Sequence, residues 1–228
     1  MSITDAKGVK QRLAELETDI AGIASIDRFH DAPPGFHPTD LVKDCQSVIV
    51  FAVRFPTGTL YGSSQAAYTF VRNRLADKID SVAFQLAREL EEDGKWAVPI
   101  PSTEPYEYWD EERQHGRGIL SLKHAAVLAG LGQIGKNTLL VNERFGNMLW
   151  LGAVLVDTAY EADPVATYQT CPPDCRICLK ACPAQALDGV TIEQSKCRNA
   201  SGKYSPGGGA VYACNLCRKI CPKHCGIG

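Results

Sequence analysis

The cysteines of this 228-residue chain gather near its C-terminus and constrain its fold more than any other feature. Nine of the ten lie between Cys171 and Cys225, and only Cys45 lies outside that segment. The N-terminus, MSITDAKGVK, lacks the basic start and apolar run of a secretory signal, so we expect a cytoplasmic protein. In that compartment, dense and regularly spaced cysteines bind metal more often than they form disulfides. The sequence therefore predicts metal–thiolate bonds.

Residues 171–228 are poor in core-forming side chains. Only eleven of these 58 residues are Ile, Leu, Val, Phe, Met, Trp or Tyr, and eight Lys/Arg stand against three Asp/Glu. A small domain without a core needs covalent or metal cross-links, which the cysteines can supply. The formal charge of +5 would also suit anionic metal clusters, since the rest of the chain carries −7.

The cysteine spacing indicates the kind of metal centre. CPPDCRICLKACP (171–183) matches the two-cluster ferredoxin run C-x2-C-x2-C-x3-C-P with one extra residue, and CNLCRKICP (214–222) forms a second block. Three thiolates on a tight loop can hold three corners of an iron–sulfur cube, and the proline after the last cysteine directs that thiol to the other cluster. We therefore predict two [4Fe–4S] clusters. One is ligated by Cys171, Cys175, Cys178 and Cys221, the other by Cys182, Cys197, Cys214 and Cys217.

Two cysteines remain outside these sets, and one alternative metal has to be weighed. We interpret Cys45 as a small buried apolar residue and Cys225 as a free thiol, or as a substitute ligand for Cys221. Paired C-x2-C units also build zinc sites. Eight interleaved cysteines with two Cys-Pro ends favour clusters over zinc.

The first part of the chain, residues 1–165, is predicted to be a mixed α/β domain, with residues 166–228 as the cluster domain. Leu13, Leu16, Ile20 and Ile23 have helical spacing and predict a first helix. Apolar residues between 71 and 90 recur at steps of three and four and predict a long helix ended by Gly94. Further elements are expected as strands at 47–53, 96–100, 138–142 and 148–157 and as a helix at 121–129, the last two strands forming a hairpin through residues 143–147.

A glycine-rich loop, GLGQIGKN (130–137), imitates two nucleotide-binding motifs. It contains G-x-G-x-x-G and nearly matches a phosphate-binding loop, but both motifs require a strand before the loop and a helix after it. Here the predicted order is reversed, so we interpret the loop as a helix C-cap and turn. Three glycines still permit close approach to a cofactor. The cofactor-binding candidates are Gly130, Gly132, Gly135, Lys136 and Asn137.

From this loop onward the sequence resembles a known family. The run AGLGQIGKNTLLVNERFGNMLWLGAVLVDT, followed by both cysteine blocks and Cys197, is similar to epoxyqueuosine reductases and the related reductive dehalogenases. The resemblance covers roughly residues 68–222. It implies a nitroreductase-like α/β domain that binds cobalamin against the 130–137 loop, and a ferredoxin-like domain whose two clusters reduce that cobalamin. A flavin, or no organic cofactor, is the alternative.

Two departures from the family bear on the substrate. In epoxyqueuosine reductases, an acidic residue in a short Asp-Ser-Ala-Pro segment serves as proton donor. This chain has Pro101-Ser102-Thr103-Glu104-Pro105 at that place, with no aspartate in register. The sequence also ends at Gly228 without the helical-repeat extension used in tRNA recognition. We therefore expect a short relative that does not act on tRNA, and the formal net charge of −2 likewise does not suggest a nucleic-acid partner.

The long polar stretch 101–118 is the expected substrate loop, because loops of this length in a compact domain often bind ligands. Its candidate proton-transfer residues are Glu104, Tyr106 and Tyr108, each of which could equally be an ordinary surface residue. The leading hypothesis is an oxidoreductase that receives electrons from a partner protein and reduces a small molecule. The alternative is an electron-transfer protein or redox partner subunit. The longest apolar run, 148–156, is too short to span a membrane as a helix.

Overall fold

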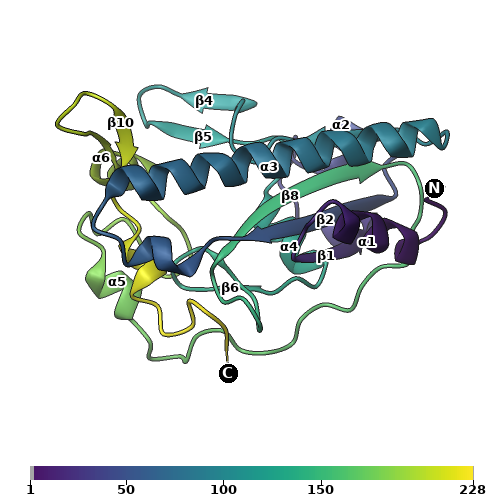
Figure 1. Ribbon diagram of the computed structural model, residues 1–228. Helices are drawn as coiled ribbons and strands as arrows, with labels where there is room; N and C mark the ends of the chain where they lie inside the picture. The colour runs from purple at the N-terminus through teal and green to yellow at the C-terminus, as the bar shows by residue number, and fades with distance from the viewer. Residues whose placement is uncertain (1–2, 228) are drawn as a thin grey trace.

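A four-stranded antiparallel sheet forms the centre of the computed structural model, which describes residues 3–227 (Figure 1). The strand order is β1–β2–β8–β3, with β1 at Ile20–Ser25, β2 at Ser47–Arg54, β8 at Leu149–Val156 and β3 at Ala97–Ile100. Strand β8 pairs with β2 along its whole length, from Leu149 opposite Arg54 to Val156 opposite Ser47. The sheet therefore joins segments about a hundred residues apart.

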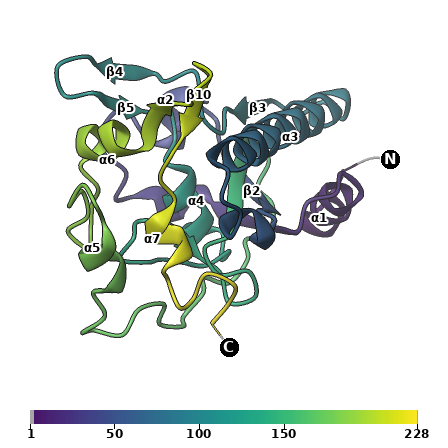
Figure 2. The same ribbon diagram turned by 60° about the vertical axis from the view of Figure 1, so that its left-hand side comes forward.

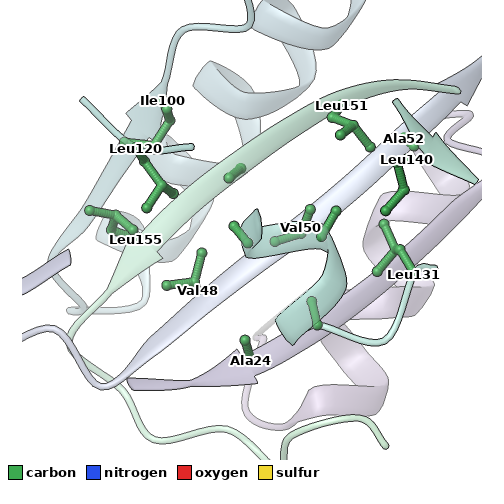
Figure 3. Close-up of a cluster of buried hydrophobic side chains, with 14 of the residues drawn as sticks. Ala24, Val48, Val50, Ala52, Ile100, Leu120, Leu131, Leu140, Leu151 and Leu155 are labelled. Atoms are coloured by element: carbon green, nitrogen blue, oxygen red, sulfur yellow. The ribbon is translucent and has the colours of Figure 1, made fainter. Parts of the chain in front are cut away.

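Helices cover both faces of this sheet. On one face α1 (Ala6–Glu15) and α3 (Gln65–Glu92) share a core with Ile49 and Phe51 of β2. On the other, α4 (Leu122–Leu128) packs over Val48 and Val50, which alternate with them along the strand (Figure 3). The predicted mixed α/β class is confirmed.

The long helix predicted between residues 71 and 90 is part of α3, which begins after the N-cap Ser64 and stops at the C-cap Asp93. Gly94 follows with φ +78°, a left-handed conformation that ends helices and suits glycine. Gly152 of β8 lets the helix approach the sheet, because a Cβ there would lie 2.6 Å from Ile79 Cγ2 and 2.8 Å from the Phe51 ring.

The predicted first helix is wrong beyond Leu16. Helix α1 ends at Glu15, Glu17 takes φ +59°, and the Thr18 amide and hydroxyl both donate to Leu13 O, which closes the helix end. Ile20 and Ile23 belong to strand β1, paired with β2. Their helical spacing was coincidental, because the polar Glu17–Asp19 turn separates them from the helix.

The predicted hairpin between residues 138–142 and 148–157 is also wrong in its pairing. Strand β7 is only Leu140–Val141 and pairs with β6 (Gln133–Ile134), whereas β8 pairs with β2 and β3. The strand at 148–157 and the helix at 121–129 are present as β8 and α4. Helix α4 precedes the glycine loop, and the short β6–β7 hairpin begins within it. The helix therefore comes before the strand, which is the reverse of the order that nucleotide-binding motifs require.

The cysteine-rich segment lies at one end of the α/β body (Figures 1 and 2). Its elements are α5 (Ile177–Ala181), α6 (Gln194–Ser201), β9 (Gly202–Tyr204), β10 (Ala210–Tyr212) and α7 (Leu216–Lys219). It packs on α3, where the Tyr212 amide donates to Thr69 Oγ1 at 2.9 Å. The division at 165/166 stays a prediction, with residues 1, 2 and 228 outside the described range.

The remaining elements are short: the 3-10 turns Ile26–Phe29 and Thr57–Leu60, helix α2 (Pro38–Leu41), and a hairpin of β4 (Tyr108–Asp110) and β5 (His115–Arg117). The hairpin lies within the stretch 101–118 that was expected to be the substrate loop. Among the described residues, none of the helices combines the length and apolar character needed to cross a membrane.

Candidate metal centre

The four cysteines of the first predicted set come together from two separate parts of the chain. Cys171 and Cys175 lie in the turn before α5, Cys178 lies on α5, and Cys221 follows α7. Burial raises the pKa of Cys178, and the three other thiols of the set lie close enough to raise it further. The fold thus delivers Cys221 across the gap of more than forty residues that the Cys-Pro pattern predicted.

The second predicted set surrounds a small cavity. Cys182, Cys197, Cys214 and Cys217 line it together with the apolar side chains of Pro183, Ala184, Ala186, Leu187, Ile192 and Ala200. Burial raises the pKa of Cys217 to about 11, and the neighbouring thiols of this set add to the shift. Apolar walls and sulfur donors are the lining that an iron–sulfur cluster needs.

Zinc is the alternative metal for these thiols. Among residues 3–227, no three Cys, His, Asp or Glu side chains are grouped so that they could hold a single metal ion. Zinc requires all of its sulfur ligands about 2.3 Å from one point. A four-iron cube takes each thiolate on a different iron and holds the sulfurs further apart. The choice of clusters over zinc, and the ligation itself, stay predictions.

Backbone amides are directed at the sulfurs, as expected for sites that will carry negative charge. The Ala186 amide lies 3.3 Å from Cys182 Sγ, and the Lys136 amide lies 3.5 Å from Cys171 Sγ. The two sets are also neighbours, since α5 packs against α7 and Cys178 contributes to the raised pKa of Cys217. The two cysteine sets therefore lie side by side.

Lys136 and Asn137 of the glycine loop hold the cysteine segments in place. The Lys136 ammonium donates to Pro172 O at 3.1 Å, Pro173 O at 2.6 Å and Cys175 O at 3.0 Å. These carbonyls belong to the turn that carries the extra residue of the first cysteine block. Asn137 is buried and donates from Nδ2 to Cys217 O at 3.2 Å. One loop therefore supports both cysteine sets.

The three glycines of the loop are required by contacts within the chain. A Cβ on Gly130 would lie 2.2 Å from Pro164 O, and one on Gly132 would lie 2.5 Å from Val141 O. At Gly135 it would meet Asn137 Oδ1 at 2.9 Å. Packing within the chain thus accounts for all three glycines. The corrinoid contact expected of this loop from the resemblance stays a prediction.

Of the three proton-transfer candidates, only Tyr106 is joined to the cysteine segment. Its hydroxyl accepts from Arg198 Nη2 at 3.0 Å, and its ring stacks on Trp109 at 5.7 Å. Glu104 is exposed, and Tyr108 is 46% exposed beside Arg117. The structure therefore does not bring the three together.

Helix α6 anchors the β4–β5 hairpin, a connection that the sequence reasoning missed. The Gly116 amide donates to Gln194 Oε1 at 3.1 Å, and Gln194 Nε2 donates to Gly116 O at 3.0 Å. Arg198 lies over the Tyr106 and Trp109 rings. Because α6 also carries Cys197, the hairpin is tied to the second cysteine set. The sequence signal for this contact was weak: polar residues stand directly beside Cys197.

The two leftover cysteines lie away from both sets. Cys45 is 2% exposed and its thiol points to Ser47 O at 3.5 Å, consistent with a small core residue. Cys225 is exposed, with Sγ 3.9 Å from Thr57 Oγ1.

Several known proteins are similar to this chain in sequence. No protein-family model matches the chain. An epoxyqueuosine reductase of Staphylococcus aureus is 34% identical over 120 residues, which cover 48% of this chain and 31% of that protein. One from Pseudomonas aeruginosa is 32% identical over 111 residues, covering 44% and 30%. A third, from Atelocyanobacterium thalassa, is 27% identical over 205 residues, covering 84% and 63%.

The chain is a homologue of the epoxyqueuosine reductases. It spans about a third of the length of the first two of these relatives. Its fold matches the epoxyqueuosine reductase of Streptococcus thermophilus with a TM-score of 0.66 at 20% identity, over 96% of this chain and 66% of that one. A reductive dehalogenase described as B12-dependent matches with a TM-score of 0.67 at 19% identity, over 97% and 32%. The predicted family resemblance is thus confirmed.

One structural neighbour bears on the expected absence of a nucleic-acid partner. An epoxyqueuosine reductase solved with an epoxyqueuosine-modified tRNA stem loop matches with a TM-score of 0.59 at 19% identity, over 95% of this chain and 66% of that one. That neighbour is bound to RNA in its structure, and this chain shares its fold. The neighbour was solved with RNA, so the expected absence of a nucleic-acid partner is taken up again as a proposal below.

Proposed function

We propose that this chain is an iron–sulfur oxidoreductase in which two [4Fe–4S] clusters relay electrons to an acceptor in the α/β domain. The observation that carries the proposal is the convergence of two interleaved four-cysteine sets, with Cys221 and Cys182 each crossing to the other block. Inward-directed amides and an apolar lining support the same interpretation. The names of the homologues support a reductase.

The donor would be a one-electron carrier protein that meets the cysteine-rich end of the molecule. For the acceptor we propose cobalamin, on the strength of the B12-dependent neighbour alone. We assign it no residues, because contacts within the chain already account for the glycines of the 130–137 loop. When bound, cobalamin would supply a strongly reducing metal centre. The chain's own contribution is to hold the clusters beside the α/β body and to keep water from the second set by its apolar walls.

Two substrate classes are proposed. A small molecule remains the first, with Tyr106 as the candidate proton donor because it lies just before the β4–β5 hairpin and its hydroxyl is bound by Arg198 of α6. A modified nucleoside in tRNA is the second, favoured by the names of the homologues and by the tRNA-bound neighbour. A chain that transfers electrons without substrate chemistry of its own is the alternative to both.

Metal analysis after anaerobic purification tests the clusters. We expect about eight iron and eight sulfide per chain. Cys221→Ser should lose about half of the iron, whereas Cys225→Ser, a matched change four residues away, should keep all of it. Stoichiometric zinc in a colourless protein, or iron loss only in Cys225→Ser, would contradict the proposal.

Cofactor and substrate are tested on the same preparation. Titration with cobalamin and with FMN, followed by their absorbance changes, should show saturable binding of cobalamin. Single-turnover reduction is then compared for a tRNA stem loop carrying epoxyqueuosine and for a halogenated phenol. Full clusters with neither binding nor turnover would support the electron-transfer alternative.

A further inference from the structure

Arg218 on α7 is a buried cation without a carboxylate partner. Its side chain is 7% exposed, and among residues 3–227 no Asp or Glu oxygen lies within 4.0 Å of it. It donates to Asn147 O, contacts the Tyr68 hydroxyl and lies 5.9 Å from the Phe55 ring centre. Burial of a charged group is costly unless an opposite charge compensates it. Within residues 3–227, the protein atoms supply dipoles here but no carboxylate within 4.0 Å.

Hydrogen bonds with Asn147 hold both the guanidinium and the backbone carbonyl of Arg218 in place. Asn147, itself 1% exposed, accepts from the guanidinium through its carbonyl and donates from Nδ2 to Arg218 O at 3.2 Å. Tyr68 is packed against Phe55 at 5.2 Å between ring centres, which holds its hydroxyl in place. The guanidinium therefore cannot swing into solvent without breaking a buried network.

The predicted cluster ligand next to Arg218 in the sequence is Cys217. Arg218 directly follows Cys217, and its charge counteracts the burial that raises the pKa of that thiol. A [4Fe–4S] cluster with four thiolates has a formal charge of about −2 when oxidised and −3 when reduced, so a fixed cation stabilises the reduced form more. Low exposure strengthens the effect because water screens it less.

We propose that Arg218 is the internal counter-ion of the cluster held by Cys182, Cys197, Cys214 and Cys217, and that it raises the reduction potential of this cluster. The inference rests on the proposed function, since it requires that cluster. Reduction adds one electron and no proton, and the electron comes from a low-potential one-electron donor. Arg218 touches no substrate and acts only through the cluster, so it is a positioning residue that sets which cluster is reduced more readily.

The test is a redox titration of anaerobically reconstituted protein, followed by the electron paramagnetic resonance signals of the reduced clusters. Dithionite and ferricyanide set the potential, and iron is measured on every sample. Arg218→Met should lower the potential of one cluster so that, at a fixed potential, its reduced-to-oxidised ratio falls about tenfold, or roughly 59 mV for one electron. Arg218→Lys should recover most of that shift. Arg176→Met removes an exposed arginine beside Cys175 and should change neither potential.

The outcomes separate the inference from the function beneath it. Full iron with unchanged potentials in Arg218→Met would overturn the counter-ion role. If that variant loses iron, Arg218→Lys decides, because it keeps the charge and should titrate close to wild type; a tenfold change there would overturn the proposal. A wild type without iron would instead refute the clusters themselves.

Discussion

Replacement of Lys136 by Met tests how the α/β domain supports the first cysteine set. Lys136 is half-buried, and its ammonium donates to three carbonyl oxygens of the 172–175 turn at 2.6–3.1 Å. Methionine keeps a stem of similar length and apolar character but removes the charge and all three donors. The change should therefore loosen the turn that carries Cys171 and Cys175 while leaving the packing of the loop in place.

The magnitude follows from the hydrogen bonds. A bond to a charged group contributes about 1.5–3 kcal/mol, but three bonds to one ammonium are not additive. Pro172 and Pro173 are exposed, so water can replace part of the loss. We estimate about 2–3 kcal/mol for closing the turn, equivalent to roughly 30- to 150-fold in its open-to-closed ratio.

The assay is the rate of cluster loss to an iron chelator under anaerobic conditions, followed by visible absorbance. Lys136→Met should release about half of its iron faster than wild type by a factor within that range, and the other half at the wild-type rate. Lys180→Met, which removes an exposed lysine from α5 between Cys178 and Cys182, serves as the control and should behave as wild type. Equal rates for Lys136→Met and the control would refute the reasoning.

Three further predictions concern the scaffold. Gly152→Ala should destabilise the protein by about 1–3 kcal/mol in urea unfolding, because the added methyl group collides with Ile79 and Phe51; an unchanged midpoint would contradict the packing argument. Glu89→Gln should lower the free energy of unfolding by about 1 kcal/mol at pH 7, since Arg12 holds the pKa of Glu89 below its ordinary 4.5. This stabilisation is complete above pH 4.5 and is lost as the pH falls through the lowered pKa. A destabilisation that persists in acid would be inconsistent with this ion pair. Gln194→Ala should accelerate amide exchange in the β4–β5 hairpin by roughly tenfold, for the loss of two hydrogen bonds to Gly116, and exchange at the wild-type rate would show that α6 does not anchor the hairpin.

Local patterns were sufficient where a single segment carries its own signal. The steps of three and four in α3 reflect one buried stripe, and Gly94 marks its end because few other residues accept its left-handed backbone. The cysteine spacing likewise indicated which cysteines come together, since the reach of a tight loop and the turn at each Cys-Pro limit which thiols can meet. Their ligation of clusters stays a prediction. Local spacing misled at Ile20 and Ile23, where strand pairing with β2 outweighed a helical pattern.

The roles of the glycine loop were decided only by the tertiary structure. Its sequence indicated close approach to something, and glycine spacing cannot say to what. The partner is the chain's own backbone at Val141 and Pro164, two later segments that the fold brings against the loop. The same holds for Arg218, an ordinary basic residue in the sequence, which becomes a buried cation because α7 packs against Asn147 and α3. Burial and countercharge depend on contacts between distant segments, so no local pattern records them.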